Sequence, residues 1–258
     1  EPSVSVLDPS VSFSGRSSLY SAMKLDGKGF DWIKTSDDMR LFIAIPHQKK
    51  LAIIDLQTLT IRDHVALPGQ PTRVALQPDE RLLWVGLTGA AGDNAVEIID
   101  TVHDKAIARI PLPPGYHEIV FSSDGRHVFI SNRQSQSLTI VDAATFKVVR
   151  EVELGFEPIS LMFVDASALL WVVDAKAGKI HRFDVKGKPV DHWMLNPGLG
   201  PIRLTPDSRY ALVVNPSQHQ IHVIDVATAQ EKHRITLSGQ PYDILFSAQY
   251  AYIRTLHN

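Results

Sequence analysis

A short apolar run that ends in aspartate recurs along the 258-residue chain. The six aspartates are Asp8, Asp55, Asp100, Asp142, Asp184 and Asp225. Their spacings of 47, 45, 42, 42 and 41 residues indicate one repeated structural unit. Because a unit of about 40 residues buries too little apolar surface to be stable alone, successive units must pack against one another.

A second repeated feature is an Asp-x-Arg turn followed by a strand-like run. It occurs at Asp38–Arg40, Asp79–Arg81, Asp124–Arg126 and Asp207–Arg209. Each unit then holds four short runs rich in Val, Ile, Leu and aromatic residues, separated by turn residues. We therefore predict an all-β fold, a β-propeller of four-stranded blades. The chain lacks the sustained 3.6-residue periodicity of a helical solenoid.

The residues that recur from unit to unit are predicted to be structural. An Asp side chain at a turn accepts hydrogen bonds from nearby backbone N–H groups, so the repeated aspartates are expected to cap turns. Trp84, Phe129 and Trp171 fall at equivalent positions of the second strands. We expect these aromatic rings to pack between blades and not against a cofactor.

The chain is predicted to form a single domain of six blades. Five blades span about 30–71, 72–116, 117–158, 159–200 and 201–241, and a composite blade joins 1–29 with 242–258. Pairing the first and last strands would remove two open sheet edges. The alternative is that the sequence belongs to a chain of seven or eight blades.

Composition excludes several kinds of site and partner. The absence of Cys rules out disulfides, thiol nucleophiles, thiolate-bound zinc and iron–sulfur clusters. A formal charge of −2 gives no general attraction to nucleic acids or anionic lipids, and basic and aromatic residues do not interleave as in single-strand binders. The longest apolar runs, such as Leu82–Leu87, are too short to span a membrane. Neither nucleic acid nor a membrane span is expected.

One family resemblance rests on the third unit. The run 119–132 reads IVFSSDGRHVFISN, and the run 138–149 reads LTIVDAATFKVV. Together they resemble the YVTN-type β-propeller repeat, with its Ser-Pro-Asp-Gly turn, aromatic-Val-x-Asn strand and Val-x-Val-Ile-Asp-x-x-Thr strand. The resemblance covers nearly the whole chain and implies a propeller fold. Similar families include surface-layer proteins, periplasmic proteins, haem-carrying propellers of nitrite reductases and propeller subunits of amine dehydrogenases.

The resemblance also implies a cellular location. Its exported members suggest a periplasmic or otherwise exported protein. The first residues, Glu-Pro-Ser-Val-Ser, have no Met and no charged-then-apolar leader, so we interpret the sequence as a mature chain without its signal peptide.

The candidate binding face follows from propeller geometry. Loops on one face of a rigid ring, where first strands begin and second strands turn into third strands, are the usual place for a ligand site. The residues predicted to bind there are Asp31, Trp32, Arg73, His117, Glu118, Arg133, Tyr242 and Asp243. Aromatic and Arg side chains suit a protein partner or a small ligand, and plain packing of exposed loops is the alternative.

Three histidines are the candidate ligands of a metal or haem. They are His47, His117 and His257, and a neutral imidazole is a common metal ligand. They come from three different blades, and the chain has no His-Glu-x-x-His motif, so spacing does not show whether they converge. For His117 the alternative is a hydrogen bond from the start of a strand to a neighbouring loop.

Independent catalysis is not expected, and no catalytic residue is predicted. Asp31, Glu118 and Asp243 could act as paired carboxylates, but the chain has neither a Gly-x-Ser-x-Gly elbow nor a phosphate-binding loop. We therefore predict a binding or scaffold protein that recognises a protein partner or a small ligand at the channel mouth, with no cofactor firmly implied. The alternative is an accessory or subunit of a haem- or quinone-linked respiratory or dehydrogenase system, which would bind haem or copper.

Overall fold

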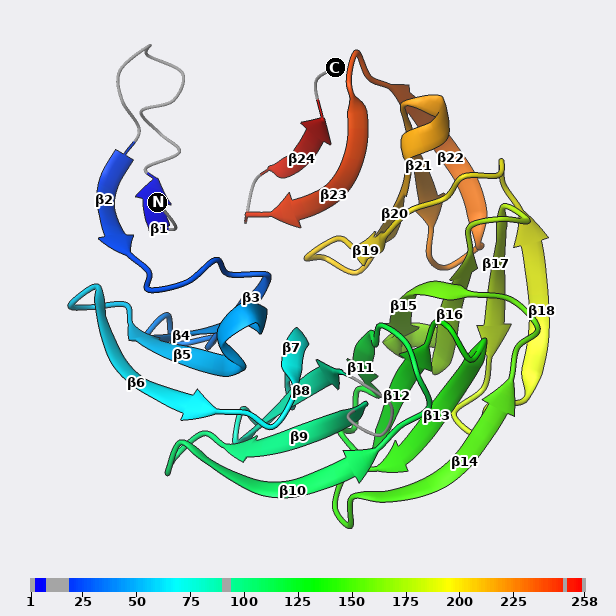
Figure 1. Cartoon of the computed structure of the whole chain (residues 1–258). Coiled ribbons are helices and arrows are strands. Elements are labelled where there is room, and N and C mark those ends of the chain that lie inside the picture. The colour runs from blue at the N-terminus through cyan, green and yellow to red at the C-terminus, as the bar shows by residue number, and fades with distance from the viewer. Residues whose placement is uncertain (1–2, 8–18, 90–93, 248–249, 257–258) are drawn as a thin grey trace. The chain divides into compact units, whose positions relative to one another are not determined.

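The computed structural model describes residues 3–7, 19–89, 94–247 and 250–256 (Figure 1). The chain divides into two compact units, Glu1–Pro111 and Leu112–Asn258. Each unit is built from consecutive antiparallel sheets in which neighbouring strands follow one another in the sequence.

The first unit holds one two-stranded and two four-stranded sheets. The two-stranded sheet pairs β1 (Ser3–Leu7) with β2 (Leu19–Lys24). The next sheet contains β3 (Asp31–Lys34), β4 (Arg40–Ile45), β5 (Lys50–Asp55) and β6 (Thr60–Ala66), with the short 3-10 helix η2 (Pro46–Gln48) between β4 and β5. The third contains β7 (Gln70–Leu76), β8 (Leu82–Thr88), β9 (Ala95–Asp100) and β10 (Lys105–Pro111).

The second unit holds three four-stranded sheets and one two-stranded sheet. The first contains β11 (Ile119–Phe121), β12 (His127–Asn132), β13 (Ser137–Asp142) and β14 (Lys147–Glu153). The second contains β15 (Pro158–Val164), η3 (Asp165–Ser167), β16 (Leu169–Asp174), β17 (Lys179–Phe183) and β18 (Pro189–Met194). The third contains β19 (Ile202–Leu204), β20 (Tyr210–Asn215), η4 (Pro216–Gln218), β21 (Gln220–Asp225) and β22 (Gln230–Thr236). The last pairs β23 (Gln240–Phe246) with β24 (Ala251–Leu256).

These sheets confirm the predicted all-β architecture of successive four-stranded antiparallel units. The number of blades stays a prediction. The pairs β1–β2 and β23–β24 belong to different units, so their union in one composite blade also stays a prediction.

The core of each unit lies between successive sheets. In β15, Leu161 and Phe163 pack toward the β11–β14 sheet, and the alternate residues Met162 and Val164 pack toward the β19–β22 sheet. This alternation follows from the two-residue period of a strand. Because both faces are covered, second and third strands are apolar along nearly their whole length, as in β8.

Aromatic residues of the second strands fill these interfaces. Trp84, Phe129 and Trp171 are each 0% exposed, which agrees with the packing role predicted for them. Phe129 stacks on Phe163 of the next sheet with ring centroids 5.6 Å apart, and Trp171 meets Trp193 edge to face at 4.7 Å. Such pairs add specific geometry to the burial of apolar area.

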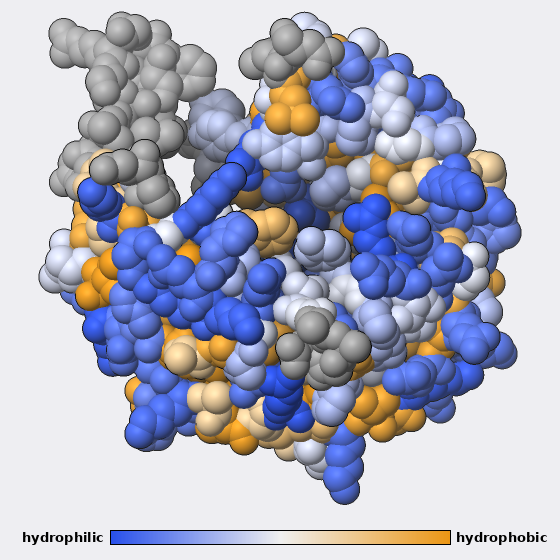
Figure 2. All heavy atoms as spheres, viewed as in Figure 1, coloured by the Kyte–Doolittle hydropathy of each residue, from blue (hydrophilic) through white to orange (hydrophobic). Residues whose placement is uncertain are grey.

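The fourth strand of each sheet is an exposed edge. In β14 and β22 almost every residue is exposed, and both strands are rich in Lys, Arg and Glu. Charged side chains on an edge strand discourage pairing with another chain. On the face shown in Figure 2, hydrophilic residues surround smaller apolar areas. Among the described residues, no helix is long and apolar enough to cross a membrane.

The turns between first and second strands carry the predicted Asp caps. Asp124 accepts hydrogen bonds from the Ser122 hydroxyl at 2.6 Å and the Arg126 N–H at 3.0 Å. These bonds, with that of Ser122 the strongest, lower the pKa of Asp124. Asp79 and Asp207 accept the equivalent backbone N–H at 3.1 Å.

In the β3–β6 sheet, the capping residue differs from the sequence prediction by one position. Its capping carboxylate is Asp37, which accepts from the Thr35 hydroxyl at 2.5 Å and the Met39 N–H at 3.0 Å. Asp38 instead pairs with Lys34. The sequence has two adjacent aspartates here, and the Thr35 hydroxyl selects Asp37 because it lies two residues before it, as Ser122 does before Asp124.

Candidate functional site

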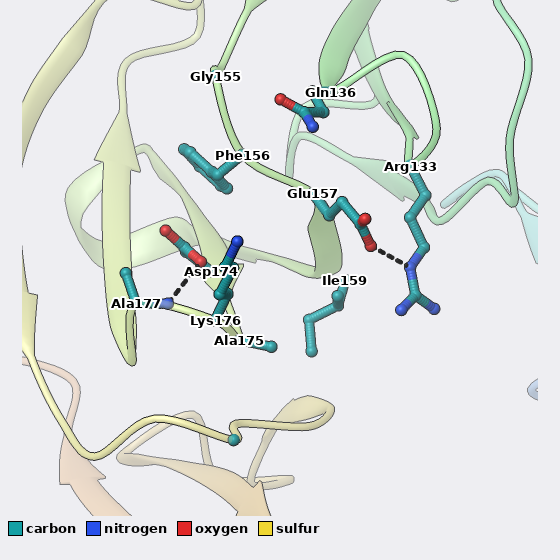
Figure 3. A pocket seen from close by; sticks show the side chains of 11 residues that line it. Arg133, Gln136, Gly155, Phe156, Glu157, Ile159, Asp174, Ala175, Lys176 and Ala177 are labelled. Carbon is teal, nitrogen blue, oxygen red and sulfur yellow. Dashed lines mark hydrogen bonds and ion pairs between the residues drawn. The ribbon is translucent and has the colours of Figure 1, made fainter.

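The second unit contains a pocket of about 740 Å³ (Figure 3). It is lined by Arg133, Gln136, Gly155, Phe156, Glu157, Ile159, Asp174, Ala175, Lys176, Ala177 and Gly198. These residues combine an apolar wall with two basic and two acidic side chains. A volume of this size is within the range of small-molecule sites.

The pocket forms where two neighbouring sheets present the same end. In an antiparallel sheet of four consecutive strands, the turn between strands two and three lies at the end where strand four leaves for the next sheet. The β12–β13 turn supplies Arg133 and Gln136, and the β16–β17 turn supplies Asp174 to Ala177. The β14–β15 connection supplies Gly155 to Glu157.

Arg133 and Glu157 form an ion pair on one side of the pocket. The Arg133 Nε–H donates to Glu157 Oε2 at 3.2 Å, and the two side chains are 49% and 57% exposed. In the described part of the chain, no acceptor bonds the terminal guanidinium nitrogens of Arg133. Because the pair is exposed, it stabilises the fold little, and the guanidinium stays accessible from the pocket.

The opposite side of the pocket rests on a half-buried histidine. Phe156 stacks on the imidazole of His181, with ring centroids 4.4 Å apart and planes inclined by 15°. Asp174 is 7% exposed; its Oδ1 accepts from the Ala177 N–H at 3.0 Å, and its Oδ2 lies 3.9 Å from His181 Nε2. Figure 3 shows Phe156 and Arg133 on opposite sides of the pocket, with Ile159 between them.

The protonation of His181 depends on these surroundings. Burial lowers the pKa of His181, and the neighbouring His192, whose ring centroid is 5.4 Å away, lowers it further. The carboxylate of Asp174 opposes this effect and Lys179 adds to it. His181 therefore supports the pocket wall as a neutral imidazole near pH 7.

Gly178 fixes the turn that carries Asp174 and Lys176. It has φ +67°, a left-handed conformation that favours glycine. A Cβ at this position would lie 2.6 Å from the backbone of Asn196 and Pro197. The turn is thus held against the connection between β18 and β19, which also brings Gly198 to the pocket.

Arg133 is the one member of the predicted binding set that lines this pocket. Two other members, Asp31 and Arg73, join neighbouring sheets in the first unit. Asp31 Oδ2 accepts from the Val74 N–H at 2.9 Å and lies 3.5 Å from Arg73 Nη1. Trp32, which follows Asp31 in β3, is 50% exposed.

In the second unit, Asp243 and Tyr242 make comparable contacts. Asp243 Oδ1 lies 3.1 Å from Arg203 Nη2, so this pair links the first strands of two sheets. The guanidinium of Arg254 lies over the Tyr242 ring, 4.8 Å from its centroid. Each of these contacts joins two strands, and the predicted binding role of Asp243 and Tyr242 stays a prediction.

His117 and Glu118 anchor the start of β11 on β12. His117 is 3% exposed and its Nδ1 lies 3.0 Å from the Ser131 carbonyl oxygen, so Nδ1 carries a proton. The Glu118 N–H donates to Ser131 Oγ at 2.9 Å. Burial lowers the pKa of His117, while the Ser131 carbonyl and the Asn132 side chain oppose the shift. The hydrogen bond of His117 thus goes to the adjacent strand β12 and not to a loop, and its role as a ligand stays a prediction.

The metal-ligand role of His47, His117 and His257 stays a prediction. His47 is exposed in η2 of the first unit, and His257 lies outside the described residues. Within the described ranges, no group of three or more His, Asp or Glu side chains is arranged to hold a metal ion.

Sequence reasoning missed Phe156, Glu157 and Lys176. Phe156 and Glu157 belong to the segment Gly155–Pro158, and Lys176 to the turn after β16. A signal was available, because a connection from strand four to strand one reaches the same sheet end as the turn that contains Arg133. The prediction used only the strand starts and the turns between second and third strands, and it selected no residue of the β16–β17 turn.

The family described as Cytochrome D1 heme domain matches residues 16–166, more than half of the chain. The chain belongs to this family. The likeness to propeller families with haem-carrying members is thereby confirmed, and the successive sheets are those of a β-propeller of the cytochrome D1 family. The match spans parts of both units.

Two curated relatives of this cytochrome D1 family member differ in how much they share with it. Protein NirF of Pseudomonas aeruginosa is 28% identical over 116 residues, 45% of this chain and 29% of NirF. A 6-phosphogluconolactonase of Yersinia pestis is 24% identical over 220 residues, 79% of this chain and 66% of the lactonase. The chain thus spans less than two thirds of the length of either relative.

Solved structures share the fold at low identity. Kuenenia stuttgartiensis hydrazine synthase matches with a TM-score of 0.75 and 19% identity, over 90% of this chain and 75% of that chain. The β-propeller domain of Cps50 (Swd1) from Myceliophteria thermophila matches with a TM-score of 0.74 and 13% identity, over 94% and 83%. A protein of unknown function from Desulfotomaculum acetoxidans gives a TM-score of 0.74 at 15% identity, over 84% and 72%. These likenesses establish the fold and leave the role open.

Proposed function

We propose that this chain is a ligand-recognition β-propeller without independent catalytic activity, and that its second unit binds a small ligand in the pocket between β12–β13 and β16–β17. The observation that carries the proposal is the pocket itself, where Phe156 and Ile159 form an apolar wall beside Arg133 and Lys176. Apolar walls with a few well-placed polar groups are the usual form of a small-molecule site.

The surrounding contacts support a preformed site. Phe156 is held by His181, and Asp174 closes its own turn through the Ala177 N–H. A side chain that is already ordered loses less conformational entropy when a ligand binds. We also propose, from the resemblance to exported propellers, that the chain acts outside the cytoplasm.

The test is a small-molecule screen by ligand-observed NMR on the whole chain, repeated with Phe156→Ala. We expect ligands whose signals change with the native protein and not with this variant. Val149→Ala, at an exposed residue of β14, is the matched control, and circular dichroism checks that both variants fold. If every ligand binds both variants equally, the pocket is not the binding site and the proposal fails.

The family match favours a second candidate, a haem-linked accessory role, because the family is described as a heme domain. The pocket does not fit an axially ligated haem, because its lining contains no His, Cys, Met or Tyr. Only one ring nitrogen of His117 has a hydrogen bond, but the residue is 3% exposed, so a haem macrocycle cannot reach it. The measurement is the visible absorption spectrum of purified protein before and after titration with haemin. If the protein carries no stoichiometric haem and binds no added haemin, this candidate is excluded.

A further inference from the structure

The acidic and basic side chains of the pocket differ in how many of their hydrogen-bonding groups are free for a ligand. Both acidic side chains have a donor within the protein: Glu157 accepts from the Arg133 Nε–H, and Asp174, which is 7% exposed, accepts from the Ala177 N–H. Asp174 is therefore largely closed to a ligand, and the charge of Glu157 is shared with Arg133.

The basic side chains still have donors to offer. Arg133 uses Nε–H for Glu157, while its terminal nitrogens carry four further N–H groups with no acceptor in the described ranges. Lys176, exposed at the tip of the β16–β17 turn, also has no bonded partner there. The strongest free donors of the pocket thus come from its two cations.

The pocket also has an aromatic residue in its apolar wall. One face of the Phe156 ring is covered by His181 at a centroid distance of 4.4 Å, and the ring also lines the pocket together with Ile159 and Ala175. An aromatic ring fixed in this way favours a planar partner, which gains area and ring-to-ring contact at once.

We propose that the pocket takes a small organic acid with a planar ring. This inference rests on the proposed function and names the class of ligand. The acid group bonds the terminal nitrogens of Arg133, whose fork matches two carboxylate oxygens, and Lys176 adds a second positive charge. The ring lies against Phe156 and Ile159.

The experiment compares five probes, three of which share a naphthalene ring. 2-Naphthoate, 2-naphthylmethanol and 2-naphthylmethylamine differ in charge, cyclohexanecarboxylate keeps the acid without the planar ring, and glucose 6-phosphate represents a sugar phosphate. Binding is measured by calorimetry and by NMR shifts on the whole chain. We expect 2-naphthoate to bind at least about tenfold more tightly than the other four, as the loss of one charge-assisted hydrogen bond implies.

Variants locate the acid group. Arg133→Gln should weaken 2-naphthoate binding about tenfold and Lys176→Gln about threefold. Arg126→Gln and Lys186→Gln, at exposed turns on the opposite end of the same two sheets, should leave it unchanged. Glu157→Gln should strengthen binding, because it removes a negative charge and a competing acceptor of Arg133; a misfolded variant would not show such a gain.

Each outcome decides a different statement. If the amine or the alcohol binds as tightly as the acid, or if Arg133→Gln has no effect, the acid assignment is wrong while the pocket stands. Equal or tighter binding of cyclohexanecarboxylate or glucose 6-phosphate overturns the planar ring. If no probe binds, the inference is wrong, and the wider screen with Phe156→Ala decides the proposed function separately.

Discussion

The ring of Phe156 lies parallel to the imidazole of His181, tilted by only 15° at a centroid distance of 4.4 Å. A residue that lines the pocket is thus supported by a titratable group beneath it. The burial that lowers the pKa of His181 makes its protonation unfavourable in the folded state.

We expect acid to destabilise the second unit through His181. Its pKa in the folded chain lies below the ordinary value near 6.5, so its contribution is present above about pH 6.5 and is lost as the pH falls toward the folded pKa. His181→Phe keeps a ring against Phe156 and removes the titration. Urea unfolding between pH 7.5 and 5 should show a smaller loss of stability for this variant, and an equal loss in both proteins contradicts the prediction.

Replacing Gly178 with Ala should destabilise the turn beside the pocket by about 3 kcal/mol, because strain at positive φ adds to a contact with the Asn196 backbone. Gly155 is the matched control. It also has positive φ, +74°, but an added Cβ there would meet nothing within 4 Å, so Gly155→Ala should cost only about 1 kcal/mol. Thermal unfolding of the two variants checks the difference, and equal costs would show that the close approach at Gly178 is unimportant.

Asp31 should stabilise the first unit as a hydrogen-bond acceptor more than as a charge. Asp31→Asn keeps an oxygen for the Val74 N–H and should cost less than about 1 kcal/mol, the usual value of a partly exposed ion pair. Asp31→Ala leaves that N–H without its partner and should cost about 2 kcal/mol. Denaturant unfolding of both variants measures the gap; a similar cost for both would assign the effect to the pair with Arg73.

We expect Glu231 to contribute to the decrease in the free energy of unfolding at acid pH. Its hydrogen bonds to Arg234 and His222 lower its pKa from 4.5 to about 2. The stabilising contribution is therefore complete above about pH 4.5 and disappears as the pH falls toward 2. Glu231→Gln should flatten the pH dependence in this window, followed by circular dichroism. Glu153→Gln, an exposed residue of β14, is a control that should leave it unchanged.

The strands and the core could be predicted because the sequence shows both the repeat of the units and the apolar runs of the strands. The spacing of Asp100, Asp142 and Asp225 sets the repeat, and apolar runs such as 128–130 and 138–141 fill strands covered on both faces. The capping residue of the β3–β4 turn was predicted at Asp38 instead of Asp37. Both aspartates are suitable acceptors, and only the Thr35 hydroxyl distinguishes them.

The pocket was harder to predict than the strands. Arg133 could be placed at a sheet end from its position after β12, but Phe156 and Lys176 come from other connections of the chain. Their meeting depends on the close approach at Gly178 and on a ring that packs onto His181. Neither relation follows from repeat spacing, because both involve residues that differ between the repeats.

The caps made by Ser122 with Asp124 and by Thr205 with Asp207 all lie at the sheet end opposite the pocket. These two sheets, β11–β14 and β19–β22, are thus closed by local bonds at one end, leaving the other end free to vary in sequence. A protein engineer could exchange the segments around Arg133 and Phe156 for others while keeping the capped turns, and so give this scaffold a new specificity.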